Sequence, residues 1–310
     1  MHRPADCTPS VPSQANAKAL SPPSRSPEVY TRILSEAPIF KIPRDVPSLQ
    51  AAERNMIALN LISKDEQDAF FSLYNTHGSS YSPSLGIAKT NALPLGSGAS
   101  EGGLFLEASR INHAYRPNAQ NTWNANLEKI TIHACRDIEQ GEEITISYLD
   151  GSQGYNARQL SLKNSFAFTC GCELCCLPPA QRRRSDQRLD EITRLDNLIG
   201  DGVRIVSTPL ACLRAAYALL GLLQEEGIAD ARKPRLYYDA LQIAIANGDR
   251  ARAKVFARRA HDARVVLEGN DSPEAIKMKG YADRPTDHRL YGTSMRSMEA
   301  SCGQRSVRCK

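Results

Sequence analysis

The chain of 310 residues is long enough for about two domains, each with a hydrophobic core of its own. Its content of 41% hydrophobic and 24% charged residues is that of an ordinary soluble protein. The net charge of +5 is mild and comes in part from the run R-R-R at 182–184 and from an Arg-containing tail, so it does not indicate a nucleic-acid-binding surface.

The N-terminal residues 1–27 are rich in Pro and Ser and are expected to be disordered. They begin with M-H-R-P-A-D-C-T-P-S, which lacks the apolar core of a secretory signal. The most apolar stretch, residues 210–223, contains Arg214 and has the length of one buried helix, so it is not expected to span a membrane. The sequence therefore predicts a protein of the cytoplasm or the nucleus.

The next hundred residues carry mixed signals. Between residues 32 and 47 the pattern predicts two short strands separated by Pro38. Residues 48–77 are predicted to be helical. Residues 78–103 are rich in Gly and Ser and are predicted to be loop-like, with a short apolar island at 86–88.

The clearest strand signals lie between residues 129 and 148. Apolar residues alternate with polar ones on both sides of the turn E-Q-G-E-E, at Ile130, Ile132 and Ala134 and again at Ile144, Ile146 and Tyr148. Tyr148 is thus in phase with the buried face and is expected at the end of its strand. Taken alone, such a tyrosine is most simply a core residue whose hydroxyl lies at the rim.

Four of the nine cysteines fall between Cys170 and Cys176. In a chain without a signal peptide, this clustering favours free thiols or a metal site over disulfides. From Arg188 onward the periodicity is helical.

Three helix starts in this part carry capping signals, namely Thr208 before Pro209, Asp249, and Ser272 before Pro273. The helix after Asp249 is predicted to bury Val255, Phe256, Ala260, Ala263 and Val266. Helices of this length joined by short loops are expected to stack into an α-helical, repeat-like domain. The tail at 292–310 is expected to be disordered.

Three segments, in order along the chain, resemble the motifs of the SET-domain protein-lysine methyltransferases: N-H-A-Y-R-P-N, G-E-E-I-T-I-S-Y-L-D and F-A-F-T-C-G-C-E-L-C. The likeness runs from about Arg32 to about Tyr291 and is strongest to the branch with a split SET domain, although no MYND finger is visible. It implies an α+β fold. The expected parts are a mostly-β SET domain at 28–168 with a helical insert at about 48–103 and a knot-like threaded loop, a post-SET cysteine segment at 169–180, and a TPR-like helical domain at 185–291.

The resemblance also implies roles for individual residues. Tyr148 matches the catalytic tyrosine, and Phe166 matches an aromatic residue that lines the channel for the substrate lysine. The residues that match contacts to the cofactor S-adenosylmethionine are Asn91, Asn112, His113 and Phe168. The implied reaction is displacement of a methyl group from a sulfonium by a lysine amine. The amine has an unperturbed pKa of about 10.4 and must first lose its proton.

Two features depart from the family pattern. Cys170, Cys172 and Cys175 match zinc ligands of the family, but the fourth thiolate would come from the position that Tyr115 occupies here. A phenol is a poor zinc ligand because its pKa is about 10, and Cys176 would close a strained chelate with its neighbour. A Zn²⁺ ion would therefore find an incomplete ligand set, and a group of reduced thiols without metal stays an alternative.

The second departure is the lack of a G-x-G turn before Arg32, where the family's backbone approaches the methionine end of the cofactor. We therefore expect weak cofactor binding by a methyltransferase that is incomplete at its N-terminus. The alternative is a catalytically inactive, SET-derived interaction scaffold. The implied partners are a lysine of a protein substrate, such as a histone tail, and proteins that bind the helical domain.

Overall fold

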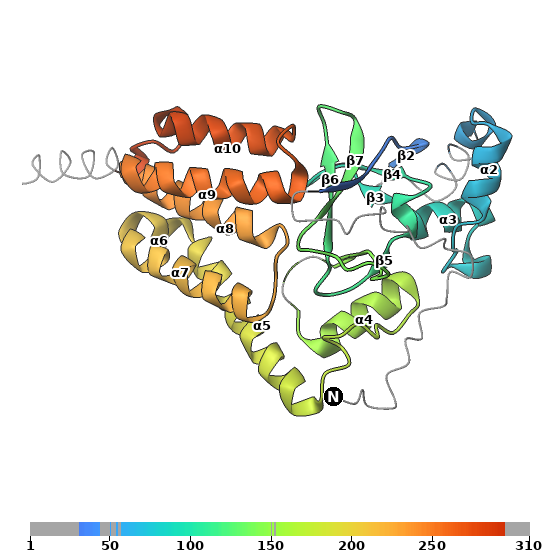
Figure 1. The fold of residues 1–310 in the computed structure, drawn as a ribbon, viewed down its shortest axis with the longest axis horizontal. Helices are drawn as coiled ribbons and strands as arrows, with labels where there is room; N and C mark the ends of the chain where they lie inside the picture. The colour runs from blue at the N-terminus through green and yellow to red at the C-terminus, as the bar shows by residue number, and fades with distance from the viewer. Residues whose placement is uncertain are drawn as a thin grey trace, which may run out of the picture. The chain divides into compact units, whose positions relative to one another are not determined.

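The computed structural model describes residues 31–43, 50, 54, 57–149, 151 and 153–294 (Figure 1). The fold is α+β, with short strands in the first half of the chain and long helices in the second. The chain divides into two compact units, which we call unit 1 (Met1–Arg183) and unit 2 (Arg184–Lys310). The termini predicted to be disordered, 1–27 and 292–310, lie outside the described residues except for 292–294.

The first sheet of unit 1 is antiparallel. Its central strand β7 (Lys129–Ala134) pairs with β1 (Arg32–Glu36) on one side and β6 (Ala119–Asn124) on the other. The predicted strand is confirmed, and Ile130 and Ile132 are fully buried. The alternating polar residues Thr131 and His133 are buried as well, so β7 is covered on both faces. The two isoleucine side chains belong to a core made of Phe105, Ala108, Ile111, Ala119, Ile130, Ile132, Ala134, Ile138, Ile144 and Ile146.

The second sheet of unit 1 places β4 (Glu101–Leu104) between β2 (Phe40–Pro43) and β3 (Leu93–Pro94). Together with α2 (Lys64–Phe71) and α3 (Pro83–Asn91) it encloses a second core. The members of this core are Phe40, Ile42, Leu59, Phe70, Leu73, Ile87, Ala88 and Leu104. The predicted pair of strands around Pro38 is confirmed up to Pro43, and most of the predicted helical stretch before residue 57 lies outside the described residues.

The prediction of a loop at 78–103 is wrong. The stretch begins with a single 3-10 turn, Gly78–Ser80, and then forms α3, β3 and the start of β4. Ser82 accepts a hydrogen bond from the backbone N–H of Leu85, and Pro83 takes the first position of α3, so the helix has a proper N-terminus. Glycine is required in β4 by packing, since a Cβ on Gly103 would lie 2.8 Å from the ring of Phe105.

The third sheet consists of two very short parallel strands, β5 (Asn112–His113) and β8 (Thr145–Ile146). The predicted strand at 144–148 is therefore shorter than expected. Its pairing with β5 ends at Ile146. Ile144 and Ile146 are nevertheless buried, and Tyr148 packs against the same core. The threaded, knot-like path of the family stays a prediction.

Unit 2 is helical. Its helices are the remainder of α5 (Pro179–Ile199), α6 (Gly202–Ser207), α7 (Pro209–Glu225), α8 (Arg232–Ala246), α9 (Arg250–Glu268) and α10 (Pro273–Asp283), with a final 3-10 turn at Pro285–Asp287. Helix α8 packs on α7, α9 on α8 and α10 on α9, and Figure 1 draws these helices one above another. The likeness to TPR repeats stays a prediction.

The predicted caps of α9 and α10 are confirmed, since the side chains of Asp249 and Ser272 accept backbone hydrogen bonds. Thr208 is the N-cap residue of α7 but accepts no such bond there. The predicted burial of Val255 is wrong, because its side chain is 48% exposed. The buried stripe of α9 consists mainly of small residues, which let neighbouring helices approach closely: Ala253, Ala257 and Ala260.

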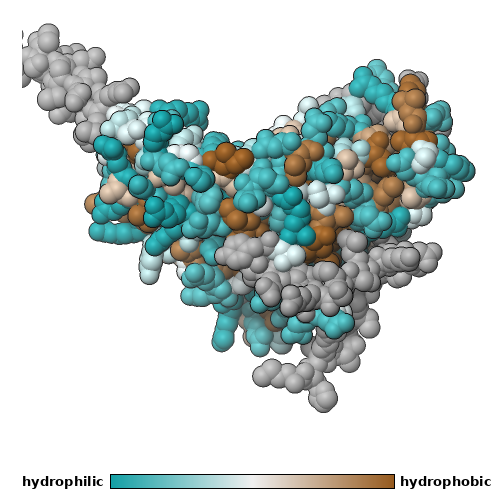
Figure 2. Space-filling model, turned by 45° about the horizontal axis from the view of Figure 1, so that its top comes forward, coloured by the Kyte–Doolittle hydropathy of each residue, from teal (hydrophilic) through white to brown (hydrophobic). Residues whose placement is uncertain are grey.

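The surface is mostly hydrophilic on the face drawn in Figure 2, where apolar side chains form separate patches. Exposed apolar residues include Leu61, Val203 and Tyr217. Within the described residues, no helix combines the length and the apolar character needed to cross a membrane.

Candidate active site

The parallel pair of β5 and β8 brings His113 and Tyr148 together, although they are 35 positions apart in the sequence. Tyr148 follows β8 by two residues, and its backbone N–H donates to Nδ1 of His113 at 3.0 Å. The centroids of the two rings lie 5.3 Å apart. Two of the predicted site residues thus form one local unit.

The segment F-A-F adds two more rings. Helix α4 (Tyr155–Phe166) ends at Phe166, and Ala167 adopts a left-handed conformation with φ of 57°. This sharp change of direction lets the residues on both sides of Ala167 face Tyr148, whose ring centroid lies 5.0 Å from Phe166 and 6.5 Å from Phe168. His113, Tyr148, Phe166 and Phe168 together form the group that we call the aromatic site.

The hydroxyl of Tyr148 is a hydrogen-bond donor in this site. It donates to the backbone carbonyl of Ile111 at 2.6 Å. Burial raises the pKa of Tyr148 well above its usual value of about 10, and the nearby carboxylate of Glu143 raises this pKa further. The phenol therefore keeps its proton at neutral pH and can orient a reacting group, whereas it is unsuited to act as a general base.

His113 is neutral at physiological pH. Its pKa is lowered to about 4, chiefly because burial disfavours the charged ring, while the charge of Cys172 acts in the opposite direction. Since Nδ1 accepts the N–H of Tyr148, the proton of the neutral ring lies on Nε2. A hydrogen bond to the backbone of Ile146 also raises this pKa, but among the described residues no acceptor lies at good hydrogen-bond geometry to the buried Nε2.

A buried donor without a partner carries a free-energy cost of about 1–3 kcal/mol. A ligand acceptor placed at Nε2 of His113 would remove this cost. The residues present therefore fit a ligand that combines an aromatic ring, which could pack against Phe168, with a hydrogen-bond acceptor. The adenine of S-adenosylmethionine has both features.

Two predicted cofactor residues, Asn112 and Asn91, make hydrogen bonds to residues outside the aromatic site. The side-chain amide of Asn112 donates to the carboxylate of Glu143 at 2.6 Å, as expected if neighbours in a strand point to opposite faces. The amide of Asn91, which is buried, donates to the carbonyls of Tyr74 at 2.6 Å and Ile87 at 2.7 Å. The predicted cofactor contacts of these two residues stay predictions.

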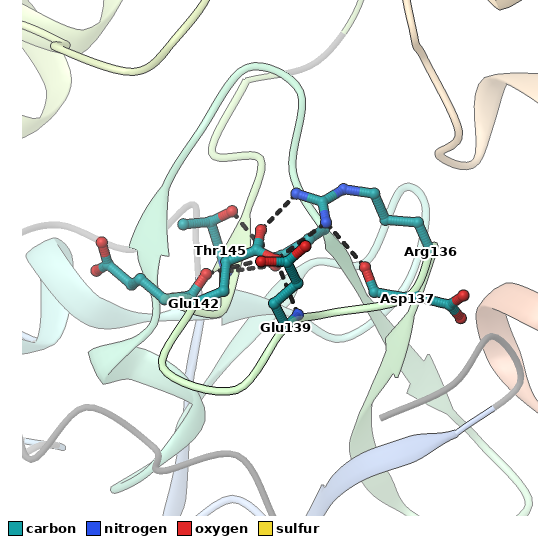
Figure 3. A network of polar contacts seen from close by, with 7 residues as sticks. Arg136, Asp137, Glu139, Glu142 and Thr145 are labelled. Carbon is teal, nitrogen blue, oxygen red and sulfur yellow. Dashed lines mark hydrogen bonds and ion pairs between the residues drawn. The ribbon is translucent and has the colours of Figure 1, made fainter. Parts of the chain in front are cut away.

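A polar network around Glu142 supports the site (Figure 3). The carboxylate of Glu142 is paired with Arg136, with N–O distances of 2.5 and 3.1 Å, and accepts the backbone N–H of Glu139. The buried amide of Asn118 donates to Glu142 at 2.9 Å, and its oxygen accepts the backbone N–H of Thr145 at 2.8 Å. The Arg136 pairing chiefly lowers the pKa of Glu142, to about 2.

This network was not predicted from the sequence. Its signals were present in the motifs, because Asn118 ends N-H-A-Y-R-P-N and Glu142 belongs to G-E-E-I. The network holds the turn between β7 and β8, and so fixes where β8 begins.

The cysteine segment contributes three thiols, those of Cys170, Cys172 and Cys175, whose sulfur atoms lie within 4.8 Å of one another. We call them the thiol triad. Hydrogen bonds from the other two thiols lower the pKa of Cys172. The triad packs against Tyr148, Phe166 and Phe168 and could hold a metal ion, although a structural zinc site takes four ligands.

The family model of the SET domain matches residues 31–149, which include the three sheets together with His113 and Tyr148. The strands of all three sheets and two of the four residues of the aromatic site, His113 and Tyr148, thus lie inside a SET domain.

The chain is similar to a protein named histone-lysine N-methyltransferase set5 from Schizosaccharomyces pombe, with 33% identity over 263 residues, 84% of this chain and 79% of that protein. Histone-lysine N-methyltransferase ATXR4 from Arabidopsis thaliana is 40% identical over 80 residues, 26% of this chain and 24% of its own. Protein-lysine N-trimethyltransferase SMYD5 from Gallus gallus is 40% identical over 76 residues, 24% of this chain and 18% of its own. The chain belongs to the SET-domain family of protein-lysine methyltransferases. These relatives do not favour the scaffold alternative.

Proposed function

We propose that this chain transfers a methyl group from S-adenosylmethionine to the side-chain amine of a lysine in a protein substrate, of which a histone is the first candidate. The observation that carries the proposal is the aromatic site, in which four residues matched to the family's chemistry converge from three separate segments. The bound cofactor would supply the methyl group on a sulfonium.

The residues of the chain would bind and orient the reactants. His113 would donate from Nε2 to an acceptor on the cofactor, and Phe168 would pack against its base. The hydrogen of the Tyr148 hydroxyl is committed to the carbonyl of Ile111, so the phenolic oxygen offers its lone pairs to an N–H of the incoming amine. Burial around this oxygen also favours the neutral, nucleophilic form of the amine. Rate enhancement then comes mainly from positioning of nucleophile, methyl and leaving sulfur.

The substrate class rests on the relatives. The proteins set5 and ATXR4 are named histone-lysine methyltransferases, and SMYD5 is named a protein-lysine trimethyltransferase. A histone substrate also makes the nucleus the proposed compartment. Binding of further protein partners by unit 2 is part of the same proposal.

The test is transfer of radiolabelled methyl groups from S-adenosylmethionine to purified histones by the full chain. Tyr148→Phe is the matched control, because it keeps the ring and removes the hydroxyl. Label on histone lysines with the unmodified chain, and much less with the variant, would support the proposal. Isothermal calorimetry of S-adenosylmethionine separates binding from turnover, and a chain that neither binds the cofactor nor labels any protein would contradict it.

A further inference from the structure

The thiol triad offers three ligands, one fewer than a structural zinc site needs. Three thiolates can be arranged around Zn²⁺, but a structural site closes its tetrahedron with a fourth protein ligand. The backbone N–H of Tyr115 hydrogen-bonds to the sulfur of Cys172, so Tyr115 lies beside the triad. The fourth position is therefore next to a residue that is not a useful zinc ligand, since a phenol loses its proton only at a pH of about 10.

Tyr115 is also engaged in another interaction. Its side chain is 2% exposed, and the guanidinium carbon of Arg158 lies 4.3 Å from the centroid of its ring. Arg158 is fully buried and donates from Nη1 to the carbonyl of Gln153 at 2.6 Å. A guanidinium stacked on an aromatic face is a stabilising arrangement, and more so when it is shielded from water. Arg158 thus places a buried positive charge on the ring of the residue beside the triad.

Three further contacts join residues on both sides of the triad to α4 without metal. Gln159 in α4 donates from Nε2 to the carbonyl of Cys170 at 2.9 Å, and its Oε1 accepts the N–H of the same residue at 2.9 Å. At the other end, the guanidinium carbon of Arg182 lies 3.9 Å from the ring centroid of Tyr155. Both ends of the segment are therefore anchored by protein groups on either side of the triad.

We propose that this chain folds its post-SET cysteine segment without structural zinc, and that the stack of Arg158 on Tyr115 replaces the bond between the metal and a fourth thiolate. The buried guanidinium holds the ring of Tyr115 in the position from which a fourth thiolate would come. The aromatic site, which packs on the triad, is then supported by protein contacts alone. This inference is independent of the proposed methyl transfer.

The first test uses the unmodified full chain, purified with reducing agent. Zinc is measured per chain by elemental mass spectrometry, and the melting temperature is recorded with and without EDTA. We expect much less than one zinc per chain and the same melting temperature in both conditions. One zinc per chain that survives dialysis, with a melting temperature that falls when EDTA removes it, would overturn the proposal.

The second test restores the fourth ligand. In Tyr115→Cys, four thiolates should bind one added zinc ion per chain, and the melting temperature of the loaded variant should fall on addition of EDTA. Tyr115→Phe is the matched control, which keeps the ring under Arg158 and should stay zinc-free. A folded Tyr115→Cys chain that ignores added zinc would refute the position assigned to Tyr115. If that variant does not fold, the measurement on the unmodified chain still decides the proposal.

Discussion

Replacing Asn118 by alanine would remove the centre of the network that fixes β8. Asn118 is 2% exposed, and its side chain makes three short hydrogen bonds: to Glu142 at 2.9 Å, to the carbonyl of Glu143 at 2.8 Å and from the N–H of Thr145 at 2.8 Å. Alanine would leave the carbonyl and the N–H without these partners. Each orphaned group costs about 1–3 kcal/mol, so we expect the two together to lower the free energy of unfolding by roughly 2–6 kcal/mol.

That loss is a large share of the free energy of unfolding of a typical folded domain, which is roughly 5–15 kcal/mol. Urea unfolding followed by circular dichroism would measure it as a lower midpoint at unchanged slope. Asn121→Ala is the control, because Asn121 lies in the neighbouring strand β6 and should change stability by about 0.5 kcal/mol or less. An Asn118→Ala chain as stable as the control would contradict this prediction. Unchanged cofactor affinity would contradict the role of β8 in positioning Tyr148 against His113.

Three further predictions concern the site and its support. Tyr148→Phe should lower kcat about 100-fold or more through loss of amine orientation, while costing about 1–3 kcal/mol of stability because the buried carbonyl of Ile111 loses its donor; unchanged turnover would remove Tyr148 from the mechanism. His113→Ala should weaken S-adenosylmethionine binding about tenfold or more in calorimetry, and more than Asn112→Ala does; the reverse order would place the cofactor on the Asn112 side. The folded pKa of Glu142, about 2, lies below its ordinary value of 4.5, so its stabilising contribution is full above that ordinary value and is lost as pH falls towards 2. Glu142→Gln should reduce this acid-induced loss by about 1 kcal/mol in melting curves at pH 2–6, because solvent screens the exposed Arg136 pair, and identical curves would contradict the assignment.

Much of the site could be predicted because its chemistry is local. The alternation around Ile130 and Ile146 identified two strands from side-chain periodicity alone, and the rings of the F-A-F segment lie two residues apart in the sequence. The contacts of Asn112 could not be predicted in this way, because they depend on which face of β5 meets Glu143 across a distance of 31 positions.

The prediction of a loop at 78–103 was wrong for a different reason. Glycine was interpreted as a sign of a loop, but Gly103 is required by the nearby ring of Phe105, and Gly86 lies in α3, where a Cβ would be 2.5 Å from the side chain of Asn75. Sequence periodicity carries no information about such close approaches. Arg158 was missed for a similar reason, since nothing in its own helix indicates that its partner is Tyr115.

The parallel pair of β5 and β8 also governs how the site can open. Only a few bonds hold it together, among them the N–H of Ala114 to the carbonyl of Ile146 at 3.0 Å, the N–H of Tyr148 to His113, and the N–H of Thr145 to Asn118. Breaking the pair would release all three amides at once, because each depends on the same two-residue register. Native-state hydrogen exchange should therefore find these amides opening as one cooperative unit, whose opening free energy sets how often the aromatic site is disassembled while the rest of unit 1 stays folded.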